Sequence, residues 1–328
     1  MRSQLPILLD KAVQRRASIR GPFTSMRLFD QAGDGLSGLW IDRYGSVALA
    51  HSTDLQISES LRSSANTPEY RELFRGLGIE TLMLRSHQEQ AATTAAAPAE
   101  LLFGSAPAPF NIEEGGVRYE VDPLRQVNAG LFLDTRELRL LLKDLSHGSR
   151  ILNLFAFTGS LGTAAFAGGA KEVIQVDISK SVLTWARRNW QINRSLNPNG
   201  IVRFFPDDVR EFLNREVRRV ERGASLADTI LLDPPSFGHS AGKAFRVLDD
   251  LGPMVERCIA LLAPAGRLLV TCNHRSLRAA DLEDLVKELS VRADRKITQV
   301  TRVLPPKDFT ASEADSLAVR GVLLKYEA

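Results

Sequence analysis

Apolar and polar positions follow a different rhythm in each half of the chain. Up to residue 122, short stretches alternate between apolar and polar residues and end at turn residues; they lie at 39–45, 47–51, 81–85, 110–112 and 117–121. Helical spacing recurs at 5–20 and 58–77, and the second stretch is broken near Pro68. This pattern predicts a small α+β domain of mostly antiparallel strands over residues 1–122.

After residue 122 the chain alternates between short apolar runs and stretches with helical spacing. The apolar runs lie at 151–157, 173–176, 201–205, 230–232, 267–272, 297–303 and 319–325. The helical stretches lie at 132–145, 161–167, 179–193, 209–222, 249–262 and 279–290. Strands that alternate with helices imply a parallel sheet covered on both faces. We therefore expect a doubly wound α/β domain over residues 123–328.

Composition and charge add little to this picture. The 328 residues are 44% hydrophobic, the net charge is only +3, and no run of 18 apolar residues predicts a membrane span. The two cysteines, Cys258 and Cys272, lie in apolar surroundings, which favours a reducing, intracellular compartment over a disulfide framework. Residues 91–109 are rich in Ala and Pro, and we expect them to form an exposed loop.

A candidate ligand loop follows the first strand of the second half, where doubly wound sheets bind their ligands. The strand runs into Phe155-Ala156-Phe157-Thr158-Gly159 and then into a helix of small residues. A dinucleotide site would prefer Gly-x-Gly-x-x-Gly, whereas this loop has only Gly159 and Gly162. The loop therefore favours a ligand with an amino-acid tail over a pyrophosphate.

Two acids follow the next two strands of the second half. Asp177 lies 18 positions after Gly159 (159 to 177), close to the spacing of about 20 residues expected of a ribose-binding acid. Asp208 is placed to accept a hydrogen bond from an adenine amine, with Val209 against the ring. Each acid has a structural alternative, because both stand at the start of a helix, where acids serve as caps or favour the helix dipole.

The Asp233-Pro234-Pro235-Ser236-Phe237 sequence is the most specific motif in the chain. Two prolines fix φ and remove two N–H donors, which predicts a rigid turn with an outward-facing acid and carbonyl groups. A planar base can be held by Asp233 and the Pro234 carbonyl and can stack on Phe237. We therefore expect a nucleic-acid base at this turn.

These motifs together resemble those of the S-adenosylmethionine-dependent RNA methyltransferases of the large-subunit rRNA methyltransferase I type. Residues 34–45 (DGLSGLWIDRYG) and 128–137 (NAGLFLDTRE) resemble two further stretches of that family. The resemblance covers roughly residues 25–310. It implies the class I, Rossmann-like methyltransferase fold, S-adenosylmethionine as cofactor, methyl transfer to a base in RNA and a cytoplasmic location. The family commonly carries an N-terminal PUA domain, which we do not expect in this chain.

The resemblance also implies roles for individual residues. The expected cofactor-binding residues are Asn128, Asp134, Phe155, Ala156, Thr158, Gly159, Asp177, Ile178, Asp208 and Val209. Phe155, Thr158 and Gly159 are assigned to the methionine part of the cofactor, and Asn128 and Asp134 to its closure. The expected catalytic residues are Asp233, Pro234, Phe237 and Cys272. We expect no metal site, and the partner is RNA, with rRNA as the first expectation.

The position of Cys272 leaves the methylated atom open. In 5-methylcytosine enzymes a cysteine at this place attacks C6 of the pyrimidine and thereby makes C5 nucleophilic. Cys272 is alternatively a small buried hydrophobe, in which case the target is a ring or exocyclic nitrogen that needs no covalent step. Cys258, inside a helix, is expected to be structural. Two other functions stay open at this point: an NAD(P)-dependent oxidoreductase and a non-catalytic RNA-binding module.

Overall fold

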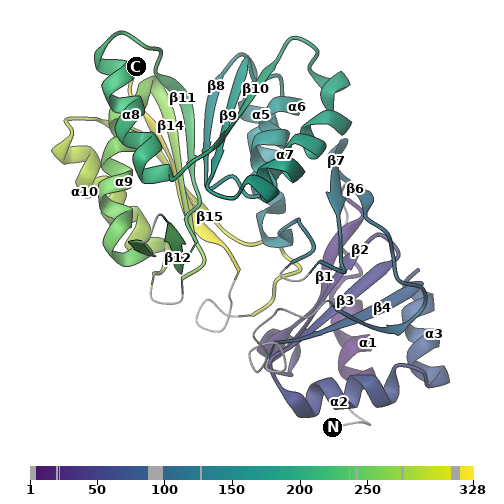
Figure 1. Cartoon of the computed structure of the whole chain (residues 1–328). Coiled ribbons are helices and arrows are strands. Elements are labelled where there is room, and N and C mark those ends of the chain that lie inside the picture. Colours follow the sequence, from purple (N-terminus) through teal and green to yellow (C-terminus); the bar gives the residue numbers. More distant parts are fainter. Residues whose placement is uncertain are drawn as a thin grey trace. The chain divides into compact units, whose positions relative to one another are not determined.

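The computed structural model describes residues 5–19, 21, 23–87, 99–125, 128–235, 237–240, 243–274, 277–311 and 318–328, with backbone alone at 237–240 and 243–245. The chain forms two compact units. The first unit comprises Met1–Asp134 and Pro306–Ser316, and the second comprises Thr135–Pro305 and Leu317–Ala328 (Figure 1). The polypeptide therefore passes between the units three times.

The first unit contains a five-stranded sheet in the order β1-β2-β3-β4-β5. Its strands are β1 (Ser25–Asp30), β2 (Leu39–Tyr44), β3 (Val47–Ser52), β4 (Thr81–Ser86) and β5 (Glu100–Phe103). All neighbouring pairs are antiparallel except β3 and β4, which are parallel because two helices join them. A separate antiparallel hairpin joins β6 (Phe110–Glu114) to β7 (Val117–Val121), and these strands confirm the stretches predicted at 110–112 and 117–121.

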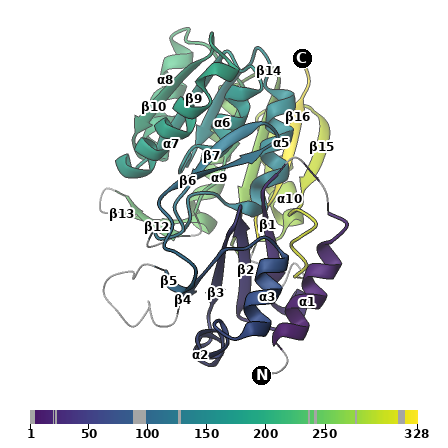
Figure 2. The ribbon, with the colours of Figure 1, turned by 90° about the vertical axis from the view of Figure 1, so that its right-hand side faces the viewer.

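Three helices pack on one face of this sheet: α1 (Leu5–Arg16), α2 (Leu55–Ser64) and α3 (Pro68–Gly76). Figure 2 shows α1 and α3 side by side over the strands. The break expected near Pro68 is confirmed, since Pro68 opens α3, where its missing N–H costs nothing. The loop expected at 91–109 is wrong in part, because β5 pairs with β4 within it; residues 91–98 lie outside the described residues.

The first unit extends beyond residue 122, where the sequence placed its end. The Tyr44 hydroxyl donates to the carbonyl of Leu131 at 3.1 Å, and the Arg85 guanidinium donates to the carbonyl of Pro123 at 3.1 Å. Both donors belong to strands of the five-stranded sheet. These long-range hydrogen bonds attach residues 123–134 to the first unit. The alternation of apolar and polar residues along the sequence does not predict them.

A buried carboxylate draws a distant segment into the first unit. Oδ2 of Asp30 accepts the backbone N–H groups of Thr310 at 2.6 Å and Ala311 at 2.7 Å. The Arg16 guanidinium donates both to the Asp34 carboxylate, at 2.6 Å, and to the carbonyl of Asp308, at 2.7 Å. Residues 306–311 are therefore bound to the first unit, although they lie between two strands of the second.

The second unit contains a seven-stranded sheet in the order β10-β9-β8-β11-β14-β16-β15. Its strands are β8 (Arg150–Leu154), β9 (Glu172–Asp177), β10 (Ile201–Pro206), β11 (Ala227–Leu232), β14 (Leu262–Cys272), β15 (Ile297–Val303) and β16 (Arg320–Tyr326). The first five strands of that order are parallel, and β16 is antiparallel to both of its neighbours. The chain order reverses at β8, which makes the ends of β8 and its neighbours the expected ligand site.

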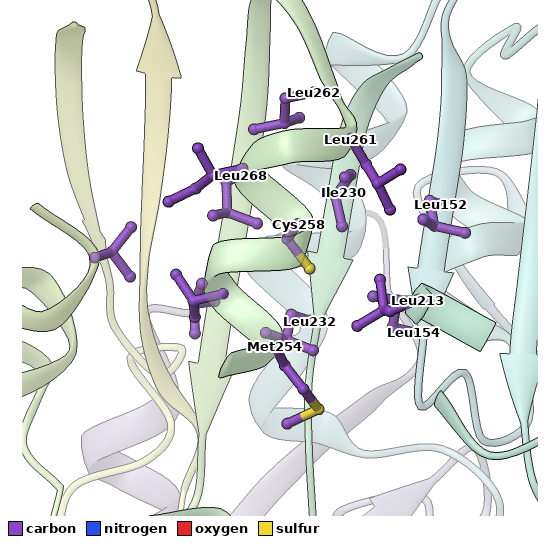
Figure 3. Close-up of a cluster of buried hydrophobic side chains, with 14 of the residues drawn as sticks. Leu152, Leu154, Leu213, Ile230, Leu232, Met254, Cys258, Leu261, Leu262 and Leu268 are labelled. Atoms are coloured by element: carbon purple, nitrogen blue, oxygen red, sulfur yellow. The ribbon is translucent and has the colours of Figure 1, made fainter. Parts of the chain in front are cut away.

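Three helices cover each face of this sheet (Figure 1). One face carries α5 (Arg136–Leu145), α6 (Ser160–Ala167) and α7 (Lys180–Ile192), and the other carries α8 (Val209–Glu221), α9 (Val247–Leu261) and α10 (Ala279–Arg292). Figure 3 shows Cys258 of α9 among the apolar side chains of the second face, such as Leu232 and Leu268. No helix in the described part of the chain is long and apolar enough to cross a membrane.

The packing of residues 306–311 against the segment that contains Asp30 and Asp34 can be tested at Gly33. A Cβ at this position would lie 2.4 Å from the carbonyl carbon of Thr310, a backbone atom. We expect Gly33→Ala to lower the free energy of unfolding by about 1–3 kcal/mol, measured by urea denaturation. The control is Gly76→Ala, because a Cβ there meets no atom within 4 Å. Equal stability of the two variants would show that residues 306–311 do not pack against Gly33.

Candidate active site

The loop after β8 has an unusual backbone. Phe155, Phe157 and Gly159 adopt φ values of 57°, 49° and 72°, so three alternate residues are left-handed. Such a φ costs a bulky non-glycine residue about 1–3 kcal/mol and persists only where the surroundings impose it. The N–H of Ala156 donates to the carbonyl of Val176 in β9, at 2.9 Å, and thereby fixes the start of the loop.

Asp177, at the end of β9, fixes the middle of the same loop. Its Oδ2 accepts the N–H of Phe157 and its Oδ1 accepts the N–H of Ser179, each at 2.9 Å. Burial raises the pKa of Asp177, and these two N–H donors partly offset the rise. A carboxylate has about four acceptor positions, so two hydrogen bonds leave capacity for the hydroxyl groups of a ribose.

Two buried amides, those of Asn153 and Gln175, support the strands from which the loop extends. Asn153 of β8 donates through Nδ2 to Oε1 of Gln175 in β9, at 3.0 Å. A Cβ at Gly159 or at Gly162 would lie 2.7 Å from the same Gln175 oxygen. The two glycines are therefore needed for close packing of α6 on these strands. The signal in the sequence was a lone polar residue, Gln175, inside an otherwise apolar strand.

The polar contacts of Asn189 and Thr158 complete the support of the loop. Nδ2 of Asn189, in α7, donates to the carbonyl of Thr158 at 2.9 Å. The Thr158 side chain is itself completely buried. Ala156 packs with Leu183 and Ala186 of α7. The buried side chains of Thr158 and Ala156 therefore fix the conformation of the loop. Only the backbone of Thr158 is left to contact a ligand.

The residues expected around an adenine divide into buried and exposed ones. Asp208 caps α8, since it accepts the N–H of Arg210 at 2.7 Å, and it also pairs with the Arg210 guanidinium at 2.9 Å. Val209 is buried in the core of the second unit. Ile178, by contrast, is 49% exposed beside Asp177, so it offers an apolar surface to a flat ring. The capping alternative for Asp208 is thus present in the structure, whatever else this carboxylate binds.

The loop fits an adenosyl amino acid better than a dinucleotide. The left-handed Gly159 and the close approach of Gly159 and Gly162 to Gln175 make a cradle that a Cβ would fill. Asp177 supplies a carboxylate at the sequence spacing from Gly159 that is expected of a ribose-binding acid, and Ile178 supplies an apolar surface. The described residues also contain no group of three side chains suited to hold a metal ion.

Asp233 follows β11, directly beside the end of β14. The Thr271 hydroxyl, buried in β14, donates to Oδ1 of Asp233 at 2.6 Å, which fixes one carboxylate oxygen. Pro234 is buried, whereas Pro235 is exposed. Phe237 opens a short hairpin of β12 (Phe237–Ser240) and β13 (Lys243–Arg246) that the sequence analysis missed. The side chain of Phe237 and the whole of Ser236 lie outside the described residues.

Cys272 ends β14, one residue after Thr271. Its side chain is 0% exposed, and its Sγ accepts the N–H of His274 at 3.3 Å. Burial raises the pKa of the Cys272 thiol, and the nearby Asp233 carboxylate raises it further. The N–H groups of His274 and Asn273 and the charge of Arg320 act in the opposite direction. Cys272 and Asp233 are therefore close enough to influence each other electrostatically.

Two of the expected cofactor residues, Asn128 and Asp134, belong to the first unit. The side chain of Asn128 is used locally, because its Oδ1 accepts the N–H of Gly130 at 3.1 Å. The other expected site residues whose side chains are described all end or follow strands of the second unit: β8, β9, β10, β11 and β14. A role for Asn128 and Asp134 in closing over a cofactor stays a prediction.

Comparison with known proteins gives this site a family. Residues 82–324 match the model of the S-adenosylmethionine-dependent methyltransferases. The chain is 31% identical over 281 residues to a ribosomal RNA large subunit methyltransferase I from Aeromonas hydrophila, an alignment that covers 84% of this chain and 68% of that protein. It is 28% identical to a ribosomal RNA large subunit methyltransferase from Deinococcus radiodurans, over 97% of this chain and 78% of that protein.

Other relatives share only part of their length with this chain. The chain is 38% identical to a ribosomal RNA large subunit methyltransferase K/L from Hahella chejuensis, over 51% of this chain and 22% of that protein. Among solved structures, a methyltransferase complexed with SAH matches with a TM-score of 0.83 and 22% identity, covering 99% of this chain and 81% of the other. A methyltransferase from Streptococcus mutans matches with a TM-score of 0.79, also at 22% identity, with the same two coverages.

The strand order, the loop after β8 and these matches agree with one another. The expected class I methyltransferase fold and the expected cofactor, S-adenosylmethionine, are confirmed. The oxidoreductase alternative and the non-catalytic alternative are set aside by the same family match. This chain belongs to the S-adenosylmethionine-dependent methyltransferases.

Proposed function

We propose that this enzyme methylates a base in RNA, with large-subunit rRNA as the substrate, and that the target is C5 of a cytosine attacked through Cys272. The observation that carries the proposal is that Asp233 and Cys272 lie at the carboxyl ends of adjacent parallel strands, β11 and β14, where Thr271 donates a hydrogen bond to Asp233. Relatives named as ribosomal RNA large subunit methyltransferases support RNA as the substrate. A cytoplasmic location, where ribosomal RNA is used, remains part of the proposal.

The loop residues have the following roles in this proposal. The backbone from Phe155 to Gly159 holds the methionine part of the cofactor, Asp177 accepts the ribose hydroxyl groups, and Ile178 covers the adenine. Bound there, S-adenosylmethionine supplies an electrophilic methyl group on a sulfonium. The protein contributes orientation, because a displacement needs its two reacting atoms in line and close together. The left-handed backbone and the Asp177 hydrogen bonds make that orientation rigid.

The residues beside the base carry the covalent step. Cys272 first loses its thiol proton to water, because the raised pKa favours the thiol. The thiolate forms a bond from Sγ to C6 of the pyrimidine, which moves electron density to C5, and C5 then takes the methyl group. Loss of the C5 proton to water breaks the bond from Sγ to C6 and restores the ring, so the thiolate is regenerated. The N–H groups of His274 and Asn273 stabilise a negative sulfur. Asp233, held by Thr271, is placed to orient the amino group of the base.

A second candidate reaction, transfer to a nitrogen, is favoured by the complete burial of Cys272. A thiol that is 0% exposed contacts no base without rearrangement of the surrounding chain. A ring or exocyclic nitrogen attacks directly through its lone pair and needs only Asp233 and the Pro234 carbonyl to orient it. The two candidates differ in their dependence on Cys272 and in the product nucleoside.

Replacement of each cysteine in turn separates these reactions. We expect Cys272→Ala to lower methyl transfer from labelled S-adenosylmethionine to unmodified large-subunit rRNA by more than about a hundredfold, because it removes the nucleophile. Cys258→Ala is the matched control, since Cys258 lies in the core of α9, and it should retain activity. Nucleoside analysis of the product should find 5-methylcytosine. Full activity of Cys272→Ala, with the label on a nitrogen, would establish the second candidate.

The reactivity of Cys272 should depend on pH. Only thiolate reacts with iodoacetamide, and the raised pKa keeps Cys272 in the thiol form at neutral pH. In the Cys258→Ala background, we therefore expect slow alkylation at pH 7 and a rate that increases as the pH rises through the alkaline range, followed by peptide mass spectrometry. Guanidinium-unfolded protein is the control and should react faster at pH 7. Rapid alkylation of the folded enzyme at pH 7 would contradict the raised pKa.

The role of Asp177 can be measured by cofactor binding alone. An amide has one acceptor oxygen, so Asp177→Asn loses the hydrogen bond to either Phe157 or Ser179. A hydrogen bond to a charged group contributes about 1.5–3 kcal/mol, so we expect calorimetry to show about 10- to 100-fold weaker binding of S-adenosylhomocysteine. Asp284 is exposed on the solvent side of α10, so Asp284→Asn removes the same charge and should bind S-adenosylhomocysteine normally. Unchanged affinity of Asp177→Asn would remove Asp177 from the cofactor site.

A further inference from the structure

The solvent-facing side of α7 carries cations at helical spacing. Lys180, Thr184, Arg187 and Gln191 recur at intervals of three or four residues, so they share one face of the helix. All four are exposed, and Arg194 continues the row in the short 3-10 helix η3 (Arg194–Leu196) that follows. We call Lys180, Arg187 and Arg194 the basic face of α7. From residue 180 to residue 194 it extends about 20 Å, at 1.5 Å per residue.

This face lies in a stretch of chain that contains no acid. Residues 178–206 include five cations, Lys180, Arg187, Arg188, Arg194 and Arg203, but neither Asp nor Glu, whereas the whole chain has 39 acids and 42 cations. An acid-free stretch of this length is therefore a local departure from a nearly balanced composition. Its charge attracts polyanions.

The helices on the other face of the sheet show what an ordinary charged surface looks like in this protein. On α8, Arg219 pairs with Glu216, and on α10, Lys287 pairs with Glu283 and Arg292 with Glu288. Within each of these pairs the two opposite charges offset each other. No carboxylate of the described residues lies within 4.0 Å of the Lys180, Arg187 or Arg194 nitrogens. The basic face of α7 is therefore not neutralised by the described part of its own chain.

Aromatic rings hold two of these cations. The guanidinium carbon of Arg187 lies 4.6 Å from the centre of the Phe204 ring, and that of Arg194 lies 5.8 Å from the centre of the Trp190 ring. Stacking uses the flat side of a guanidinium and not the N–H donors along its edge. Because the side chains are held in place in advance, less entropy is lost when those donors bind a phosphate. Arg215 of α8 also lies over a ring, at 6.0 Å from the centre of Phe212, but unlike Arg187 and Arg194 it is paired with an acid, Asp207.

We propose that the basic face of α7 binds the phosphate backbone of the RNA substrate. The inference rests on the proposed RNA methylation and extends it, because no motif of the catalytic site includes these residues. The row of cations is about 20 Å long and contains no carboxylate. It therefore suits a chain of repeating phosphates better than a single phosphate group. The row begins two residues after Ile178, so the bound strand lies beside the cofactor loop of the same unit.

The test compares two triple variants that lose the same charge. One is Lys180→Gln, Arg187→Gln, Arg194→Gln; the other is Lys287→Gln, Arg292→Gln, Lys296→Gln, whose cations are exposed but paired with acids. Binding of transcribed, unmodified large-subunit rRNA is measured by filter retention at KCl concentrations from about 50 to 200 mM. S-adenosylhomocysteine is present at a saturating concentration throughout. A plot of log affinity against log salt concentration has a negative slope. Each lost phosphate contact makes that slope less steep by about 0.7 for a single strand.

We expect the α7 variant to bind RNA more weakly, with a slope reduced by about 2, while its affinity for S-adenosylhomocysteine is unchanged. The control variant should keep the slope of the natural protein. Equal slopes for the two variants would overturn the inference and leave the proposed reaction standing, and capture of an acidic protein by α7 with unchanged RNA slopes would do the same. A reduced slope without methyl transfer to RNA would retain the inference and overturn the reaction.

Discussion

The carboxylate of Asp177 joins the two backbone segments that we propose as the cofactor site. It accepts one N–H from Phe157, in the loop after β8, and one from Ser179, at the start of α7. The loop needs this support, because Phe155 and Phe157 adopt left-handed backbone angles that cost free energy. The amides of Asn153 and Gln175 and the missing side chains at Gly159 and Gly162 let α6 approach closely enough to complete the cradle. The geometry of the site follows from these few contacts.

The first unit shows a second use of buried carboxylates. Asp30 and Asp34 lie just before and within the 34–45 stretch that resembles the methyltransferase family, and their partners are Arg16 and the backbone of residues 310–311. The stretch therefore has a structural role in this unit. Because residues 306–311 leave the second unit between β15 and β16 and return to it, the chain links the two units by three crossings.

The expected site residues lie on both sides of the central strand β8. Asp233 and Cys272 lie at the carboxyl ends of β11 and β14 on one side, and Asp177 and Asp208 lie at those of β9 and β10 on the other. The cofactor loop after β8 lies between these pairs. A parallel sheet brings the carboxyl ends of its strands to one edge, so Asp177 meets Phe157 there and Asp233 meets Thr271. The same topology sets α7, with its basic face, immediately after Asp177.

The sequence by itself determined the elements and the family. Apolar runs and helical spacing are local properties, so they located nearly every strand and helix of the second unit, and Asp177 and Asp233 were recognised because each ends such a run. Only the tertiary structure decided which polar groups meet. It showed that Asp177 binds two N–H groups, that Asp208 caps α8, that Cys272 is buried, and that residues 123–134 and 306–311 belong to the first unit. Periodicity could not reveal these facts, because each depends on hydrogen bonds or packing between segments far apart in the chain.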